Sequence, residues 1–349
     1  MSFEQNSLVI PITIDEDHLI DGAFSVLQHI RSSWSRDKTK FKVFTDGITN
    51  KLVGCFYSDC PDDVVLVRVY GQKTDLLIDR HAETRNIQLL HAAGYAPQLY
   101  ATFDNGLAYE YVSGDVLTVD TCHHISVFPL VARMMANMHR LDCGPGVPRR
   151  PALWSKVRQF MDIMPTKFED PAKQTRFEEL IPPKKKLEEE FENLKLQLTR
   201  LNSPIVFCHN DLLLGNVIYN AEKNSVTFID YEYSSYNYQA FDIGNHFAEF
   251  AGVSDVDFGR YPSEDFQRQW ISVYLEAYED REPTNDEVEQ LLIHVNKFAL
   301  AAHFLWAVWS LIQAEHSSID FDFLGYSSIK LKEYFGKKEK FLNMEFPNS

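Results

Sequence analysis

The sequence has few cysteines, a shortage of positive charge and no long uncharged apolar run. Its five cysteines are scattered without a Cys-x-x-Cys pair, which argues against a disulfide framework or a zinc site and favours a reducing compartment. Lys and Arg number 34 against 50 Asp and Glu, giving a formal net charge of −16. That charge argues against nucleic acid and anionic membranes as partners and favours a cationic substrate, although acidity also serves simple solubility.

Membrane-targeting signals are also missing. We find no run of about 18 uncharged apolar residues, and no basic segment followed by an apolar run at the N-terminus, Met1–Gln5. Ser2 occupies the position where N-myristoylation requires glycine. We therefore expect a cytoplasmic protein without stable membrane insertion. The sequence leaves the oligomeric state open, and a homodimer is compatible with it.

The chain is long enough, at 349 residues, to form two lobes, and its apolar fraction of 45% and charged fraction of 24% are those of an ordinary globular protein. Its first part contains strand-like runs at Lys40–Phe44, Lys51–Tyr57, Val64–Tyr70, Gln98–Phe103 and Leu107–Val112. Helical spacing is present over Asp79–Ala93, and from about Ser126 the pattern becomes mainly helical. We predict an α+β fold with a small β-rich lobe, residues 1–113, and a larger, mainly helical lobe, residues 114–349.

The most informative segment is His209–Asn216 together with Asp230. Asp211 precedes Asn216 by five residues, and Asp230 ends a later apolar run. This is the spacing of a kinase catalytic loop and its metal-binding aspartate, in which one carboxylate orients the attacking hydroxyl while an amide and a second carboxylate hold Mg²⁺ on the nucleotide phosphates. We therefore expect Asp211 to be catalytic and Asn216 and Asp230 to bind the metal. An ordinary hairpin with Asp and Asn at its ends is the simpler alternative.

The chain between Asn216 and Asp230 is predicted to form a β-hairpin. The segments on either side of the turn-rich Ala221–Ser225 are short and strand-like. If the hairpin is symmetric about Lys223, Asn216 and Asp230 lie opposite each other at its open end, with Asp211 just outside.

A further helix is predicted over residues 239–250, with a row of polar residues on one face. Phenylalanines flank that row, so we expect the polar face to be buried and its groups to need partners. Asp242 is expected to bond the backbone of the catalytic loop. Glu249 could reach a ligand, whereas His246 is interpreted as a core histidine rather than a catalyst.

Aromatic residues on the helix predicted over Asp286–Ala314, and just after it, form a second candidate site. They are Trp306, Trp309, Phe321 and Tyr326. An aromatic stripe is ordinarily core, but Trp also provides the best face for a cation, each contact contributing about 0.5–2 kcal/mol. Together with Glu232 and Glu249, such a cage would suit a small amino alcohol.

The first lobe offers candidates for nucleotide binding. Phe44–Asn50 lies between two predicted strands, as a phosphate-covering loop would, but it is no G-x-G-x-x-G motif and a plain hairpin turn fits equally well. Arg68 occupies the place of the kinase strand lysine, and Glu83 is its natural ion-pair partner, a solvated surface pair being the alternative. Tyr109–Val112 could contact adenine as a hinge. The predicted nucleotide-binding residues are Gly47, Thr49, Asn50, Arg68, Glu83, Glu110 and Val112, with Arg68 also counted as catalytic.

With these motifs in place, the sequence strongly resembles the choline/ethanolamine kinase family over nearly its whole length. The segments that carry the resemblance are Phe44–Lys51, His209–Asn216, Phe228–Tyr238, Phe241–Phe247 and Ile319–Leu324. It looks closest to the ethanolamine kinase branch through Leu66–Gly71, Ala96–Tyr100, Tyr109–Tyr111 and Glu249–Val253. The resemblance implies a two-lobed, protein-kinase-like fold that uses Mg²⁺ and transfers the γ-phosphoryl group of ATP to the hydroxyl of ethanolamine or choline.

The resemblance also implies roles for individual residues. By position, Asp211 is the catalytic base, and Asn216 and Asp230 hold Mg²⁺. Arg68 with Glu83 organises the phosphates. The hinge positions fall on Glu110 and Val112, and the amine pocket falls on Tyr233, Glu249, Trp306, Trp309, Phe321 and Tyr326.

One departure from the family pattern bears on the substrate. Ethanolamine kinases usually carry Leu-Leu-Cys-Lys-Asn after the catalytic aspartate and choline kinases carry Cys-Gln-Glu-Gly-Asn, whereas this chain has Leu212-Leu-Leu-Gly-Asn216. The expected activity is that of an ethanolamine kinase, with a choline or dual-specificity kinase as the first alternative. A larger aminoglycoside-type acceptor fits less well. A non-catalytic, pseudokinase-like binding module is disfavoured because the aspartates and asparagine of the motif are all present.

Overall fold

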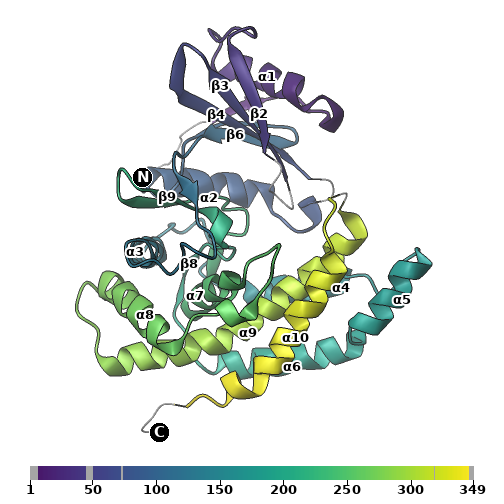
Figure 1. Cartoon of the computed structure of the whole chain (residues 1–349), viewed down its shortest axis with the longest axis vertical. Helices are drawn as coiled ribbons and strands as arrows, with labels where there is room; N and C mark the ends of the chain where they lie inside the picture. The colour runs from purple at the N-terminus through teal and green to yellow at the C-terminus, as the bar shows by residue number, and fades with distance from the viewer. Residues whose placement is uncertain (1–6, 45–49, 72–73, 318, 346–349) are drawn as a thin grey trace. The chain divides into compact units, whose positions relative to one another are not determined.

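A computed structural model of the chain describes residues 7–44, 50–71, 74–317 and 319–345 (Figure 1). Two compact units make up the chain, residues 1–113 with 317–321, and residues 114–316 with 322–349. Each unit has its own β-structure and its own buried core.

The first unit is built on a six-stranded sheet with the order β1-β5-β6-β4-β3-β2. Its strands are β1 Leu8–Ile10, β2 Thr39–Phe44, β3 Asn50–Tyr57, β4 Cys60–Tyr70, β5 Leu99–Phe103 and β6 Gly106–Glu110. Its helices are α1 Leu19–Ile30 and α2 Arg80–Ala92, with the 3₁₀ helices η1 Glu16–His18 and η2 Thr74–Leu76. Only β1, among the described strands of this sheet, pairs with its neighbour in parallel. The five predicted strands and the predicted helix of this region are confirmed, with small differences at their ends.

The core of the first unit lies between α1 and one face of the sheet. Val26 and Leu27 of α1 belong to the same buried apolar cluster as Val65 and Val67 of β4. Because successive residues of a strand point to opposite faces, Arg68 lies on the face of β4 away from this cluster. The C-terminal half of the strand is buried on both faces, which explains how a charged residue can be enclosed there.

The second unit is mainly helical, as predicted. Its helices are α3 Phe128–His139, α4 Leu153–Ile163, α5 Pro171–Leu180, α6 Lys184–Thr199, α7 Gln239–Ala248, α8 Glu264–Glu279, α9 Asn285–His316 and α10 Phe323–Leu342. Short 3₁₀ helices are η3 Leu214–Asn216, η4 Glu249–Ala251 and η5 Phe258–Arg260. The strands are β7 Asp115–Val116, β8 Ile205–Cys208, β9 Val217–Asn220, β10 Ser225–Phe228 and β11 Ser235–Tyr238. They form a sheet of order β10-β9-β7 and a β11-β8 pair.

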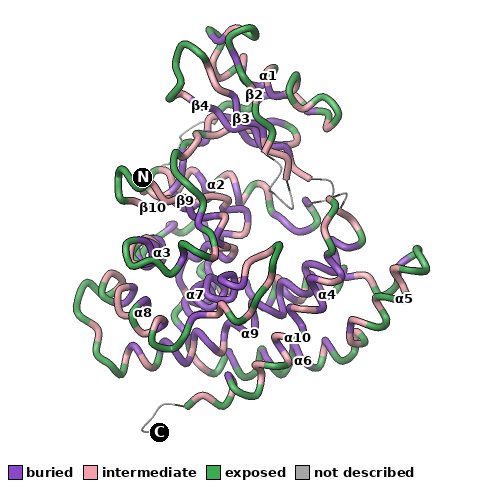
Figure 2. Tube along the Cα trace, viewed as in Figure 1, coloured by how far each residue is buried: buried purple, intermediate pink, exposed green. Residues whose placement is uncertain are grey.

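The helix α9 forms the centre of this unit, since α4, α6, α7, α8 and α10 all contact it. Figure 2 shows α7 and much of α9 coloured as buried. The two helices approach closely at Gly244, where a Cβ atom would lie 2.6 Å from the carbonyl oxygen of Val295. Glycine at this position therefore lets α7 sit directly against α9.

The same helix corrects the expectation that the chain has no long apolar run. By length and composition α9 is apolar enough to cross a membrane, with a mean hydropathy of 1.5 over its most apolar window. However, 89% of that window is buried inside the protein. The helix is apolar because neighbouring helices surround it, which is the ordinary condition of a central core helix.

The hairpin between β9 and β10 differs from the predicted register by one residue. Asn220 pairs with Ser225, so the loop has four residues where five were predicted. The side chain of Asn220 accepts a backbone N–H from within the loop at 2.9 Å, an arrangement that closes the tighter turn. Asn216 therefore lies opposite Ile229, whose N–H donates to its carbonyl oxygen at 3.0 Å, and not opposite Asp230.

Candidate active site

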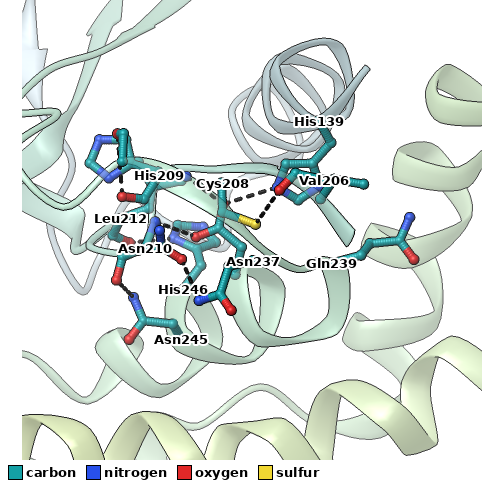
Figure 3. A network of polar contacts seen from close by, with 12 residues as sticks. His139, Val206, Cys208, His209, Asn210, Leu212, Asn237, Gln239, Asn245 and His246 are labelled. Carbon is teal, nitrogen blue, oxygen red and sulfur yellow. Dashed lines mark hydrogen bonds and ion pairs between the residues drawn. The ribbon is translucent and has the colours of Figure 1, made fainter. Parts of the chain in front are cut away.

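The loop at residues 209–216 follows β8 directly and is bonded to the helix α7. Asp242 on that helix accepts hydrogen bonds from the backbone N–H groups of His209 and Asn210, at 2.9 and 2.7 Å. Its Oδ2 also lies 2.9 Å from Nε2 of His139, whose Nδ1 lies 2.7 Å from the hydroxyl of Tyr274. Figure 3 shows His139, His209 and Asn210 in this network. The predicted role of Asp242, bonding the loop backbone, is confirmed.

The carboxyl group of Asp242 remains ionised although it is completely buried. Burial by itself raises its pKa, but the hydrogen bonds and charges of His139 and His209 outweigh that effect and lower the pKa below its ordinary value. The side chain is therefore a fixed anion that holds one end of the loop.

Two more residues of α7 bond to the same loop (Figure 3). Nδ2 of Asn245 donates to the carbonyl oxygen of Asn210 at 3.3 Å, and Nδ1 of His246 lies 2.9 Å from the carbonyl oxygen of Leu212. Burial lowers the pKa of His246 to about 4, so the imidazole is neutral at physiological pH and its Nδ1 carries the proton that the carbonyl accepts. The interpretation of His246 as a core histidine is confirmed.

Asn210 connects the loop to the chain that follows the hairpin. Its backbone is in the left-handed region, with a φ of 68°, a conformation that asparagine tolerates better than most residues. Its Nδ2 donates to the carbonyl oxygen of Tyr233 and to Oγ of Ser235, both at 2.9 Å, and its Oδ1 accepts from Asn237 at 2.8 Å. These bonds fix the backbone immediately before Asp211.

Asp211 has a different environment from Asp242. Among the described residues, none donates a hydrogen bond to its carboxylate. Burial raises its pKa well above the ordinary value, and the negative charges of Asp230, Glu232 and Glu249 raise it further. The cation of Lys330 opposes these effects. Asp211 is therefore a stronger proton acceptor than an ordinary aspartate.

Asn216 and Asp230 lie at the open end of the hairpin. Nδ2 of Asn216 donates to the carbonyl oxygen of Asp211 at 2.8 Å, which leaves Oδ1 as its ligand atom. Asp230 adopts a φ of 64° directly after the residue that pairs with Asn216. A non-glycine residue in this region is uncommon, and such residues are concentrated at functional sites.

An aromatic cluster is bonded to the same loop. Nε1 of Trp306 donates to Oδ1 of Asn245 at 2.7 Å, and Asn245 in turn bonds Asn210. Nε1 of Trp309 donates to the hydroxyl of Tyr233 at 2.9 Å. The ring of Trp306 stands edge-to-face with Tyr233 and with Trp309, at centroid separations of 5.4 and 5.7 Å. Three predicted members of the cage are thus brought together.

The remaining aromatic candidates are placed differently. Phe321 belongs to the segment 317–321, which groups with the first unit. Trp309 packs against Phe323, at a centroid separation of 6.0 Å. Sequence reasoning missed Phe323, although it lies two residues beyond Phe321 at the start of α10. Tyr326 is buried one turn further along that helix.

The predicted carboxylates Glu232 and Glu249 are both buried. Nζ of Lys330 donates to Oε1 of Glu249 at 2.7 Å, an ion pair that sequence reasoning missed. The available signal was the spacing of Tyr326 and Lys330, which places them on one face of α10.

In the first unit, Arg68 and Glu83 form an ion pair whose side chains are 6% and 0% exposed. The predicted pair is confirmed, and the alternative of a solvated surface pair is wrong. Glu83 also pairs with Arg80 at 2.9 Å, and the Arg80 guanidinium lies 3.6 Å from the ring centroid of Tyr70. Arg80 was not predicted, although it stands three residues before Glu83 on α2.

The other predicted nucleotide residues also belong to the first unit. Asn50 begins β3, and its Oδ1 accepts a backbone N–H at 3.4 Å. Glu110 ends β6 and forms two hydrogen bonds with Gln98. Its N–H donates to the carbonyl oxygen of Gln98 at 2.9 Å, and its Oε2 accepts the N–H of Gln98 at 3.0 Å. Val112 follows two residues later. Two further members lie outside the described residues, Gly47 and Thr49.

Comparison with known proteins places this geometry in a family. The choline/ethanolamine kinase family model matches residues 41–335. Ethanolamine kinase 1 of Homo sapiens is 46% identical, covering 99% of this chain and 77% of that protein, and ethanolamine kinase 1 of Mus musculus is 47% identical, covering 95% and 93%. The solved structure of a Plasmodium vivax ethanolamine kinase, 29% identical, matches with a TM-score of 0.80 over 93% of this chain and 89% of that one. The predicted α+β, protein-kinase-like fold is confirmed, and the chain belongs to the choline/ethanolamine kinase family.

Proposed function

We propose that the protein is an ethanolamine kinase, which transfers the γ-phosphoryl group of ATP to the hydroxyl of ethanolamine and yields phosphoethanolamine and ADP. The observation that carries this function is an identity of 44–47% to relatives named ethanolamine kinase over 95–99% of the chain. The reaction begins phosphatidylethanolamine synthesis by the CDP-ethanolamine route.

Asp211 is the proposed catalytic base. A carboxylate whose pKa is raised, and to which no described residue donates a hydrogen bond, is suited to accept one from the substrate hydroxyl. That bond aims the hydroxyl oxygen at the γ-phosphorus for an in-line transfer, and the carboxylate takes up the proton. Such transfers depend mostly on positioning and electrostatics, which gives catalytic importance to the hydrogen bonds that Asp242 accepts from the loop backbone.

Asn216 and Asp230 are the residues that would hold Mg²⁺. Carboxylate and amide oxygens are the ligands that this ion prefers, and the hydrogen bond from Nδ2 of Asn216 to Asp211 leaves its Oδ1 available. When bound, Mg²⁺ offsets negative charge on the ATP phosphates.

Arg68, oriented by Glu83, is the proposed phosphate-binding cation of the first unit. The other nucleotide contacts that we propose are Gly47, Thr49, Asn50, Glu110 and Val112.

The ammonium group of ethanolamine is proposed to bind against aromatic faces and buried carboxylates of the second unit. These residues are Glu232, Tyr233, Glu249, Trp306, Trp309 and Tyr326. Phe321 is kept as a proposed member from the first unit. Support comes from the shared hydrogen bonds that join Tyr233 to Trp309 and Trp306 to the α7 residue Asn245.

Ethanolamine is preferred over choline in this proposal because a primary ammonium donates three N–H bonds that buried carboxylates can accept, whereas a quaternary one donates none. The mixed segment Leu212–Gly215 keeps choline as the second candidate. Leu213 immediately precedes the 3₁₀ turn that carries Asn216, so its side chain is a candidate for setting this preference.

We further propose a cytoplasmic location, because the five cysteines are free thiols, as in a reducing compartment. The net charge of −16 disfavours nucleic acid as a partner. A homodimer is compatible with the sequence, and a mass measurement in solution would determine the oligomeric state.

The test is ADP release by the purified protein with Mg-ATP and ethanolamine, choline or no acceptor at matched concentrations. A specificity constant for ethanolamine at least about tenfold above that for choline, or about 1.4 kcal/mol in transition-state binding, is the expected result. The reverse preference would keep the chemistry and make the protein a choline kinase. Nucleotide binding without ADP release above the no-acceptor blank would indicate a non-catalytic binding module.

A further inference from the structure

Lys330 on α10 is a completely buried cation in the second unit, with 0% of its surface exposed. Buried lysines are rare because an ammonium loses its hydration unless a partner compensates for it. Here Nζ donates to Oε1 of Glu249 at 2.7 Å, and the Glu249 side chain is itself only 5% exposed. Solvent hardly screens such a pair, so its two members are held in one arrangement.

Tyr326 completes the arrangement one helical turn earlier. Nζ of Lys330 lies 5.1 Å from the ring centroid of Tyr326. Burial alone lowers the pKa of Lys330, but the charge of Glu249 and the interaction with Tyr326 outweigh it, and the pKa is raised above its ordinary value. The side chain is therefore a permanent cation, and its charge also acts on Asp211.

We propose that Lys330 is a positioning and specificity-determining residue of the amine site, which fixes the Glu249 carboxylate and the Tyr326 side chain through a buried ion pair. This inference rests on the proposed function, in which Glu249 and Tyr326 contact the ammonium. Because Lys330 occupies Oε1, the carboxylate offers its other oxygen, Oε2, to the substrate, and its charge is already partly balanced. Attraction through charge alone, which any ammonium shares, is thereby weakened. Hydrogen bonding, which only a primary ammonium provides, gains relative weight.

The opposing interpretation is that this ion pair only joins α10 to its neighbours. The same helix provides a matched control for that interpretation. Lys338 forms an ion pair with Glu190 of α6, and the hydroxyl of Tyr334 donates to Glu190 at 2.8 Å. This second group has the same three residue types and the same spacing on α10, yet none of its members is a candidate site residue.

The experiment compares Lys330→Met, Lys330→Arg and Lys338→Met with the wild type, measuring thermal unfolding together with kcat and KM for ethanolamine, choline and ATP. Lys330→Met is expected to raise KM for ethanolamine by about tenfold or more, because Glu249 is then no longer held where Oε2 accepts a hydrogen bond from the ammonium. The kcat and the KM for ATP should change by less than about threefold. The advantage of ethanolamine over choline should narrow. Lys330→Arg should restore most of the preference for ethanolamine. Lys338→Met should change the unfolding temperature but not the kinetic constants.

An unchanged or lowered KM for ethanolamine in folded Lys330→Met would overturn the proposal, as would an equal rise in Lys338→Met. If Lys330→Met does not fold, Lys330→Gln combined with Glu249→Gln removes both charges together. That pair must raise KM to a similar extent, and a KM within about twofold of the wild type contradicts the proposal. Failure of the proposed function itself is recognised separately, because wild-type protein would then release no ADP in the presence of ethanolamine.

Discussion

Asp211 belongs to the loop at residues 209–216 and Asp242 is hydrogen-bonded to that loop, yet their surroundings shift their pKa values in opposite directions. Burial raises the pKa of both carboxyl groups. At Asp242, two backbone N–H groups and His139 donate to the carboxylate and reverse the effect. At Asp211, the negative charges of Asp230, Glu232 and Glu249 increase it, and the cation of Lys330 opposes them only in part.

The direction of each pKa shift is set by the partners, since Asp242 is the more deeply buried of the two and yet has the lowered pKa. An anion supplied with donors stabilises the fold, so Asp242 holds the loop in place. An anion buried among other anions is destabilised, and that makes it ready to take a proton. The helix α7 thus gives rigidity on one side of the loop, while Asp211 retains reactivity on the other.

Removing the carboxylate of Asp211 has the largest expected effect. Asp211→Asn should lower kcat by about 10²–10⁴-fold, because a positioned general base contributes on that scale. The free energy of unfolding should stay the same or rise, because the amide removes an unfavourable buried charge. Steady-state kinetics and urea unfolding measure the two quantities. Asp162→Asn, at an exposed position of α4, is the control. A kcat within about tenfold of the wild type would contradict the role of Asp211 as base.

The sequence predicts those features of the fold and the site that depend on residues close together in the chain. The spacing of Asp211 and Asn216 follows from the chemistry they are expected to perform, and Asp242 follows from helical periodicity beside phenylalanines. Both inferences use neighbours within a few turns of chain. The sheet of the first unit was predictable for the same reason, since alternation along a strand is a local signal.

The features that sequence reasoning missed depend on distant partners or on a single residue of a turn. His139 reaches Asp242 from a helix about a hundred residues earlier, at |i−j| = 103. The spacing of Tyr326 and Lys330 places both on one face of α10, but it does not indicate that Glu249, at |i−j| = 81, will pair with the lysine. The hairpin was misplaced by one residue because the side chain of Asn220 stabilises a four-residue loop, a choice that composition alone does not decide.

Asp242→Asn tests the stabilising side of the comparison and has the next largest expected effect. An amide cannot satisfy every donor that the carboxylate accepts, so we expect the free energy of unfolding to fall by about 3 kcal/mol, with a lower kcat because the loop loses its support. Folding lowers the pKa of Asp242, so its stabilising contribution is complete above the unfolded value of about 3.9 and disappears as the pH falls through the folded value. The stability of variant and wild type should therefore converge in acid. Equal stability at neutral pH would rule out this role.

His246 supports the same loop as a neutral donor, and its effect is the smallest of the three. Folding lowers its pKa from 6.5 to about 4, so the unfolded chain takes up a proton near pH 6.5 and the folded chain does not. Stability is complete above the unfolded pKa and declines as the pH falls toward the folded one, by about 1 kcal/mol between about pH 7.5 and pH 5.5. His246→Asn keeps a donor near the position of Nδ1 and does not titrate.

Urea unfolding at the two pH values measures this contribution as a difference between proteins. His246→Asn should lose about 1 kcal/mol less than the wild type, whereas His81→Asn, at an exposed position of α2, should follow the wild type. Parallel behaviour of His246→Asn and wild type would show that folding does not shift the pKa of His246, and would contradict its role as a neutral donor to the loop.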